Sequence, residues 1–441
     1  MKFPWIAVMP MLAFTVHAQD APVALSLDAC ISQALDQNPS LQASRAKVDA
    51  ADARASETTT ALLPQLKLTG RAAELSDVPA YSLTLPGIGT KTIFPSITEN
   101  YSVRLTLQQP VFTGLKLLKT REMASLNSGA TQQDFNKDRA DLILNVTTAY
   151  WNLYRAVKVE EVIRQSVEQI SGHLRDVKNM SSQGLATDAD VMKVQVQYSQ
   201  MKVRHIEARN SIRIASMALN SILGNPIDRS VVPSDSPAVA AGAVPVREDL
   251  HDLQSRAQSQ RPELKSLELR RDMNSAGVSA ARAGWYPQVS LAANYDYARP
   301  NQRILPPVNQ WNNTWDVGLN LQWNIWDWYA TGHQTAQAEA ALRQTEAGLT
   351  QMKDAVMLDV ARQYYDVQTS QEEVGVAAEG VQQARESYRI TSDKFHAGVA
   401  SNTDLLDAEN AFLQAGLTYT QAVVDCTLAL AHLKNAVGDG N

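Results

Sequence analysis

The stretches GLATDADV (residues 184–191) and GVASNTDLLDAEN (residues 398–410) stand at matching places in the two halves of this 441-residue chain. They lie 214 residues apart, and each separates one long helical pattern from another. Glycine accepts the left-handed backbone that ends a helix, and a following hydroxyl or carboxylate can cap the next one. The candidate caps are Thr187 or Asp188 in the first stretch and Ser401 or Asn402 in the second. Both stretches are therefore predicted to be the tips of helical hairpins.

The offset of 214 residues extends well beyond the two tips. YWNL from Tyr150 recurs as YYDV from Tyr364, and farther upstream NPSL from Asn38 matches RPEL from Arg261 at an offset of 223. A period this long indicates a duplicated domain rather than a short solenoid repeat. The predicted organisation is a signal peptide (1–18), a first structural repeat (19–224), a Pro/Ala-rich linker (225–248) and a second repeat (249–441).

The first 18 residues have the pattern of a secretory signal. Lys2 precedes the apolar run FPWIAVMPMLAFTV, and a small-residue V-H-A end places cleavage after Ala18. The alternative, a buried N-terminal helix, fits poorly with Pro4 and Pro10. The sequence therefore predicts an exported protein.

Each half has the same predicted order of elements. A helical segment (27–61 and 249–283) comes first, two alternating stretches follow, and then a long helix begins. Apolar and polar residues alternate through Val103, Leu105 and Leu107 and again from Val317 through Trp323 and Ile325, which predicts strands with one apolar and one polar face. Their partner strands are predicted to start at Leu66 and Val289.

The predicted long helices carry heptad repeats. The first, at about 114–181, contains no proline and has one seven-residue column from Leu142 to Val177 and a second from Val146 to Leu174. The second half repeats this from Val360 to Phe395. Sustained heptads require partner helices, so we expect long coiled-coil hairpins.

Two strands per half give only four per chain. Four strands cannot close on themselves, and an open edge in lipid leaves backbone groups unpaired at several kcal/mol each. If the strands cross a membrane, copies must share the barrel, and three copies supply twelve strands. Membrane-interface contact is also expected from five clustered tryptophans: Trp311, Trp315, Trp323, Trp326 and Trp328. A soluble sheet with an aromatic core is the alternative.

Over nearly all its mature length the chain resembles the TolC-like outer-membrane efflux protein family. The motifs that carry the resemblance are the duplicated halves, NPSL with LLPQLKL, QQPVFTG at Gln108–Gly114, the two tip glycines and the terminal LAHLKNAVG. The resemblance implies a mainly α fold with a small antiparallel β part. It also implies a homotrimer whose long hairpins form an α-barrel, capped by a shared 12-stranded β-barrel in outer-membrane lipid. A periplasmic adaptor (membrane fusion) protein and an inner-membrane transporter would dock at the tips.

Asp404 and Asp407 lie one turn apart after the second tip. Spacing of i, i+3 puts both on one helix face, where threefold symmetry would make a ring able to hold a cation; first-turn acids that favour the helix dipole are the alternative. These positions match the aspartates of the family's pore constriction, and Asp190 matches an Asp that ties the closed mouth. The Arg and Tyr of that tie are replaced by Ala400 and Phe395.

The tips are the candidate adaptor-docking surface. We expect contacts from Gly184, Leu185, Ala186 and Thr187 at the first tip and from Gly398, Val399, Ala400 and Ser401 at the second. Cys30 and Cys426, the only cysteines, are either a disulfide of an oxidising compartment or two isolated core residues.

The composition and the motifs argue against several other functions. A net charge of −6 disfavours a nucleic-acid partner, which needs a basic face. The histidines show no metal spacing, and GxSxG, P-loop and HExxH motifs are absent, so we expect no catalytic residues, no cofactor and no enzyme. The competing reading is an exported structural coiled-coil protein without channel activity.

Overall fold

The computed structural model describes residues 23–238 and 248–439, so the predicted signal peptide and part of the predicted linker lie outside the described residues. The chain divides into two compact units. Unit 1 comprises Met1–Gln42, Arg139–Gln254 and Asp359–Asn441, and unit 2 comprises Ala43–Asp138 and Ser255–Leu358. Each unit takes segments from both halves of the sequence, and the long helices contribute to both.

Unit 1 is built mainly of helices. It contains α1 (Leu27–Gln37), the later parts of α3 (Lys116–Ser182) and α7 (Ala330–His396), α4 (Asp188–Leu223), α8 (Asn402–Val437) and a short parallel pair of strands, β1 (Val23–Leu25) and β6 (Val231–Pro233). The predicted long helices are confirmed, and α3 and α7 have the same length of 67 residues, while α4 and α8 both have 36. None of the described helices is both long enough and apolar enough to cross a membrane.

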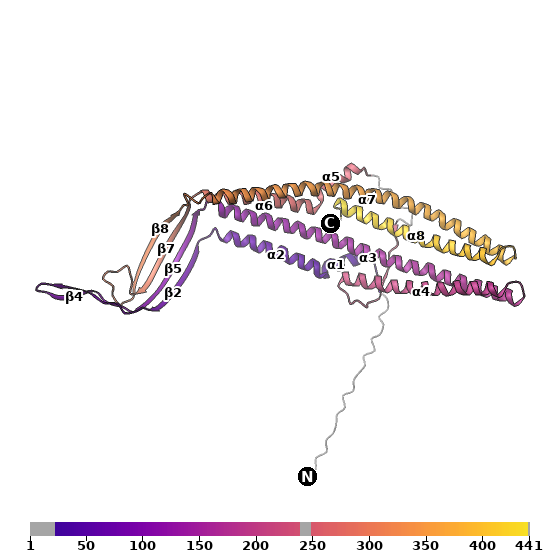
Figure 1. The fold of residues 1–441 in the computed structure, drawn as a ribbon, viewed down its shortest axis with the longest axis horizontal. Helices are drawn as coiled ribbons and strands as arrows, with labels where there is room; N and C mark the ends of the chain where they lie inside the picture. The colour runs from indigo at the N-terminus through magenta and orange to yellow at the C-terminus, as the bar shows by residue number, and fades with distance from the viewer. Residues whose placement is uncertain (1–22, 239–247, 440–441) are drawn as a thin grey trace, which may run out of the picture. The chain divides into compact units, whose positions relative to one another are not determined.

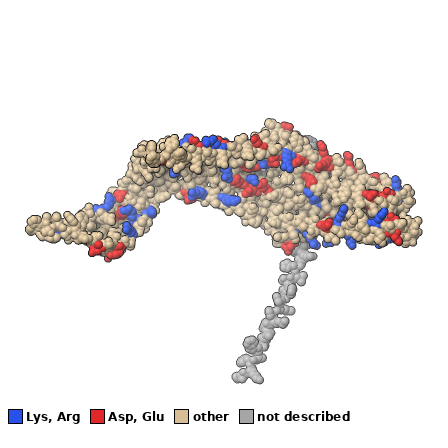
Figure 2. Space-filling view, in the orientation of Figure 1, with Lys and Arg blue, Asp and Glu red and all other residues tan. Residues whose placement is uncertain are grey.

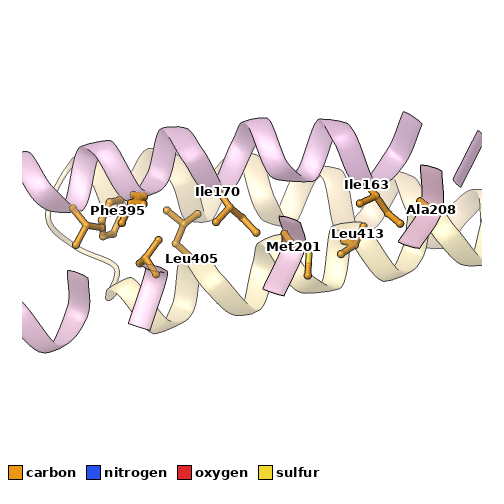
Figure 3. Close-up of a cluster of buried hydrophobic side chains, with 10 residues drawn as sticks. Ile163, Ile170, Met201, Ala208, Phe395, Leu405 and Leu413 are labelled. Carbon is orange, nitrogen blue, oxygen red and sulfur yellow. The ribbon is translucent and has the colours of Figure 1, made fainter. Parts of the chain in front are cut away.

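The heptad columns of the long helices form the core of unit 1. Ile163, Ile170 and Val177 from α3 are buried against side chains of the returning helices, as Figure 3 shows. The rest of this cluster is Leu174, Val194, Met201, Ala208, Phe395, Leu405 and Leu413. Because this core joins α3, α4, α7 and α8, the two hairpins are packed together and not merely placed in sequence.

Unit 2 contains the remaining helices. These are most of α2 (Pro39–Thr60), the end of α5 (Leu250–Gln260), α6 (Pro262–Arg282) and the 3-10 turn η2 (Ala283–Trp285). The helical segments predicted at 27–61 and 249–283 are each divided at a proline. Asn38 and Arg261 precede those prolines and have ψ near 121°, because proline disfavours a helical residue before it.

The sheet of unit 2 has four antiparallel strands in the order β2-β5-β7-β8 (Figure 1). Their bounds are β2 (Gln65–Glu74), β5 (Glu99–Phe112), β7 (Gln288–Arg299) and β8 (Asn312–Gln322). All four predicted strands are therefore confirmed. The extension of the last strand through Trp323 and Ile325 is wrong: Gln322 pairs with Gln288, and Pro287, the next residue of the partner, has no N–H for a ladder bond.

The sequence did not predict a further hairpin in the first half. β3 (Tyr81–Leu85) and β4 (Gly89–Phe94) pair antiparallel between β2 and β5. They occupy the region where the first half is longer than the second, and Figure 1 draws them beyond one end of the four-stranded sheet.

The turns from strand to long helix are the same in both halves. Gly114 and Leu115 have φ of 62° and 71°, and Trp328 and Tyr329, 214 residues later, have φ of 53° and 67°. A Cβ at Gly114 would lie 2.7 Å from the carbonyl oxygen of Ala283 and would meet positive φ as well. The second half holds the same backbone with two aromatic residues.

Candidate functional site

The first hairpin tip has the predicted glycine stop. Gly184 has φ of 74°, and the Leu185 amide donates to the carbonyl of Met180 at 2.9 Å, which closes the end of α3. Thr187 then caps α4 in a capping box: its hydroxyl accepts from the Asp190 amide, and the Asp190 carboxylate accepts from the Thr187 amide at 3.2 Å. Of the two candidate caps, Thr187 is the one used.

The second tip repeats this geometry. Gly398 has φ of 72°, and the amide of Val399 donates to the carbonyl of Lys394 at 2.9 Å. Ser401 caps α8, and its amide donates to the Asp404 carboxylate at 2.9 Å. The two tips are thus built from the same backbone stop and the same hydroxyl–carboxylate box.

The predicted acidic residues have different local roles. The Thr187 hydroxyl lowers the pKa of Asp190 below its ordinary value, and the Ser401 hydroxyl does the same for Asp404, since each carboxylate accepts bonds that favour its charged form. Asp407 is exposed one turn after Asp404. Within residues 23–238 and 248–439, no three His, Cys, Asp or Glu side chains are placed to hold a metal ion in one chain.

The two tips are linked beneath their surface. The side-chain amide of Asn402 donates to the backbone carbonyl of Asp190 at 3.4 Å, and its side-chain oxygen is buried without a partner. Ala186 and Ala400 pack against the apolar core, whereas Leu185 and Val399 are exposed, with Leu185 70% exposed. The apolar side chains open to a partner are therefore Leu185 and Val399.

A buried polar pair close to the tips was not predicted from the sequence. His173 on α3 and Glu409 on α8 lie 3.1 Å apart between Nδ1 and Oε2, with side chains only 2% and 3% exposed. The ring of His173 packs edge-on against Phe395 at 5.2 Å, and its Nε2 has no partner. The pKa of Tyr388 on α7 is raised by burial and, to a lesser degree, by the nearby Glu409 carboxylate. These contacts tie the first hairpin to the second.

The four-stranded sheet has two chemically distinct faces. Paired residues across the strands put Lys67, Thr106, Asn294 and Asp316 on one face, where Arg104 also pairs with Asp296. The other face carries exposed apolar side chains: Leu66, Leu68, Val103, Leu105, Leu107, Tyr295, Trp315, Val317, Leu319 and Leu321. Buried sheets do not leave such a face uncovered, so this face needs an apolar environment.

The five predicted interface tryptophans are all exposed and fall at three levels of the sheet. Trp311 precedes β8 and stacks on Tyr297 with ring centroids 4.8 Å apart, and Trp315 lies within β8. Trp323, Trp326 and Trp328 follow the other end of β8. The apolar face is therefore flanked by aromatic rings at both ends.

Cys30 and Cys426 are free thiols in the structure, and both are buried in unit 1. Burial raises the pKa of Cys30 to about 11 and also raises that of Cys426. Of the two readings of these cysteines, the structure has the pair of separate core residues.

A sequence model of the outer membrane efflux protein family matches residues 30–225 and 253–439. The chain belongs to this family. It is accordingly an outer-membrane efflux protein that extends into the periplasm, and its family is one of efflux proteins rather than enzymes.

Full-length relatives agree with this assignment. Outer membrane protein TolC of Vibrio cholerae is 26% identical over 410 residues, covering 92% of this chain and 89% of TolC. Alkaline protease secretion protein AprF of Pseudomonas aeruginosa is 24% identical over 438 residues, covering 97% of this chain and 87% of AprF.

Solved structures share the fold. The outer membrane protein VceC of Vibrio cholerae has a TM-score of 0.77 at 19% identity and covers 93% of this chain and 96% of its own. The CmeC outer membrane channel of Campylobacter jejuni has a TM-score of 0.78 at 15% identity and covers 100% of this chain and 94% of CmeC. The expected fold, mainly α with long helical hairpins and a small antiparallel sheet, is confirmed.

Proposed function

We propose that this efflux protein is the exit duct of a tripartite export system and works as a homotrimer. Three copies would join their sheets into a 12-stranded barrel in the outer membrane and their hairpins into a helical barrel. A periplasmic adaptor and an inner-membrane transporter would dock at the tips. The observation that carries the proposal is the two-faced sheet with two open edges.

The sheet favours closure by copies of the same chain. β2 and β8 each have a neighbour on one side only, and they run in opposite directions, so β2 of one copy can pair antiparallel with β8 of the next. Closure would satisfy every edge group, which lipid demands. The apolar face would then meet lipid, and the face with Lys67, Arg104 and Asp316 would line the water-filled lumen.

The helices offer a matching pair of surfaces. α4 carries an exposed apolar stripe whose members are three, four, seven or eight residues apart: Met192, Val196, Val203, Ile206, Ile214 and Met217. α7 carries a second stripe, Tyr365, Val376 and Ile390. Such spacing puts each set on one helix face. Two different apolar faces on one chain suit a head-to-tail contact between copies, the type that builds rings.

The tips would serve as the gated mouth and the docking surface. In the trimer Asp404 and Asp407 would supply six carboxylates around the axis, and Asp190 would lie at the facing tip. Because Ser401 already holds the Asp404 carboxylate, Asp407 is the freer ligand for a passing cation. We propose that both acids form the pore constriction.

The test is planar-bilayer conductance of the detergent-purified protein. We expect trimers that conduct and that multivalent cations block, with the block lost in Asp404→Ala/Asp407→Ala. A properly folded monomer that inserts and conducts alone would refute the duct, and unchanged cation block would refute the ring.

Docking has its own test at the tips. Leu185→Asp is expected to abolish efflux while trimers remain, because it puts a charge into the apolar contact that an adaptor would cover. Leu185→Met is the matched control and should keep efflux, since it preserves volume and polarity. Efflux that survives Leu185→Asp would count against tip docking. The alternative of a structural coiled-coil protein is not favoured by the efflux family match.

A further inference from the structure

The β3–β4 hairpin is the part of unit 2 that the proposed duct leaves unexplained. It is inserted between β2 and β5, and Figure 1 shows it extending past the end of the sheet. A two-stranded hairpin is at best marginally stable by itself in water. It therefore needs a surface to pack against.

The hairpin has one polar and one apolar face. On the polar face, the hydroxyls of Ser82 and Thr92 lie 3.1 Å apart and those of Thr84 and Thr90 lie 2.8 Å apart. The opposite face carries Leu83 and Leu85, with the rings of Tyr81 and Phe94 6.2 Å apart at its base. All four of these apolar side chains are exposed, as is Ile88 at the turn, at 78%.

Charge is almost absent from this segment. Between residues 78 and 98 the only charged side chain is Lys91, and the face of the hairpin visible in Figure 2 is free of charged atoms. Solvated edge hairpins are usually protected by charges. An uncharged, half-apolar hairpin indicates a surface that is covered in the assembled protein.

A second exposed apolar patch lies at the same end of the sheet. The connection between β7 and β8 (residues 300–311) carries Leu305, Val308 and Trp311, all exposed, with Leu305 at 72%. The pairs Glu74–Glu99 and Ala298–Asn312 show that both connections leave the sheet at this end.

We propose that the hairpin of one copy packs its apolar face on the β7–β8 connection of the next copy. This inference rests on the proposed trimer. β2 leads into the hairpin and β8 follows the 300–311 connection, and these are the two edge strands. When the edges join antiparallel, the hairpin after β2 and the neighbour's connection before β8 come to lie side by side across the seam. The contact would fasten each seam beyond the last ladder hydrogen bond.

The experiment is disulfide cross-linking between copies in a Cys30→Ala/Cys426→Ala background. Leu83→Cys is combined with Leu305→Cys, and the control combines Thr84→Cys, on the polar face, with Leu305→Cys. After mild oxidation of native trimers, we expect the Leu83 pair to convert monomer bands to dimers and trimers without reductant, and the Thr84 pair to leave monomers.

Each other outcome overturns the inference. Native trimers without cross-links from Leu83, or with equal cross-links from both pairs, would mean that the apolar face does not meet the neighbour. A dye on Leu83→Cys that brominated lipids quench in reconstituted trimers would assign the face to the lipid surface instead. Absence of trimers on native sizing would fail the proposed duct itself, which is a separate result.

Discussion

The buried pair of His173 and Glu409 gives the sharpest test of how the two hairpins are held together. With the carboxylate ionised, Nδ1 of His173 carries the proton and donates it across 3.1 Å. His173→Phe removes that donor and leaves a carboxylate that is 97% buried in an apolar core without its partner. The change keeps the ring, so its packing on Phe395 is largely retained.

The expected cost is large and asymmetric. Leaving a buried charge unpaired costs roughly 3–5 kcal/mol, whereas Glu409→Leu leaves only a neutral imidazole unpaired and should cost about 1–3 kcal/mol. Replacing both residues with apolar ones is often nearly neutral, so His173→Phe/Glu409→Leu should be more stable than His173→Phe alone.

Hydrogen exchange read by mass spectrometry measures the effect locally. At 1.4 kcal/mol per factor of ten, His173→Phe should speed exchange of amides in 163–177 and 405–413 by about a hundredfold or more. Peptides from the sheet of unit 2 serve as the internal control. Exchange equal to wild type, or a double variant as fast as His173→Phe, would refute the argument that an unpaired buried charge drives the loss.

Three further outcomes test other parts of the structure. Gly332→Ala would place a Cβ 2.5 Å from the Tyr329 ring and should lower the thermal midpoint at a cost of about 1–3 kcal/mol, whereas Gly348→Ala, in open space, should raise it by roughly 0.5–1 kcal/mol; equal shifts would contradict this. The lowered pKa of Asp190 means that its cap is at full strength above the ordinary aspartate value of about 3.9 and weakens as pH falls through the lowered value, so an NMR carboxyl titration midpoint at or above the ordinary value would be inconsistent with the cap. The thiol of Cys30, with its pKa raised to about 11 by burial, should resist alkylation at neutral pH until the protein is unfolded; rapid labelling of the folded protein would argue against burial.

Much of the fold could be predicted from periodicity and punctuation. The heptads set the two long helices, and the tip glycines set where they end, because these are local rules that operate along one segment. Strand alternation located β2, β5, β7 and β8. The end of β8 was missed because it depends on Pro287 in the partner strand, which no pattern within β8 records. The β3–β4 hairpin was missed because its apolar residues are interrupted by LPGIG and are too few for a clear period.

The site was predictable where chemistry is local. Thr187 and Ser401 follow tip glycines with an aspartate three residues on, and both form the expected boxes. The His173–Glu409 pair joins residues 236 positions apart, so only the packing of the hairpins brings them together. A histidine alone on an apolar column was the one available signal. The constriction, the docking tips, the repeat boundaries and the trimer stay predictions.

The two unpartnered strands at the ends of the sheet have a consequence for biogenesis. A newly exported copy travels with backbone donors and acceptors on β2 and β8 ready to join any extended segment it meets. Correct siblings must reach those strands before strangers do, so the yield of working protein should depend on the local supply of fresh copies and on escorts that shield them in transit. A variant that slows this encounter would accumulate as aggregates even when its finished form is sound.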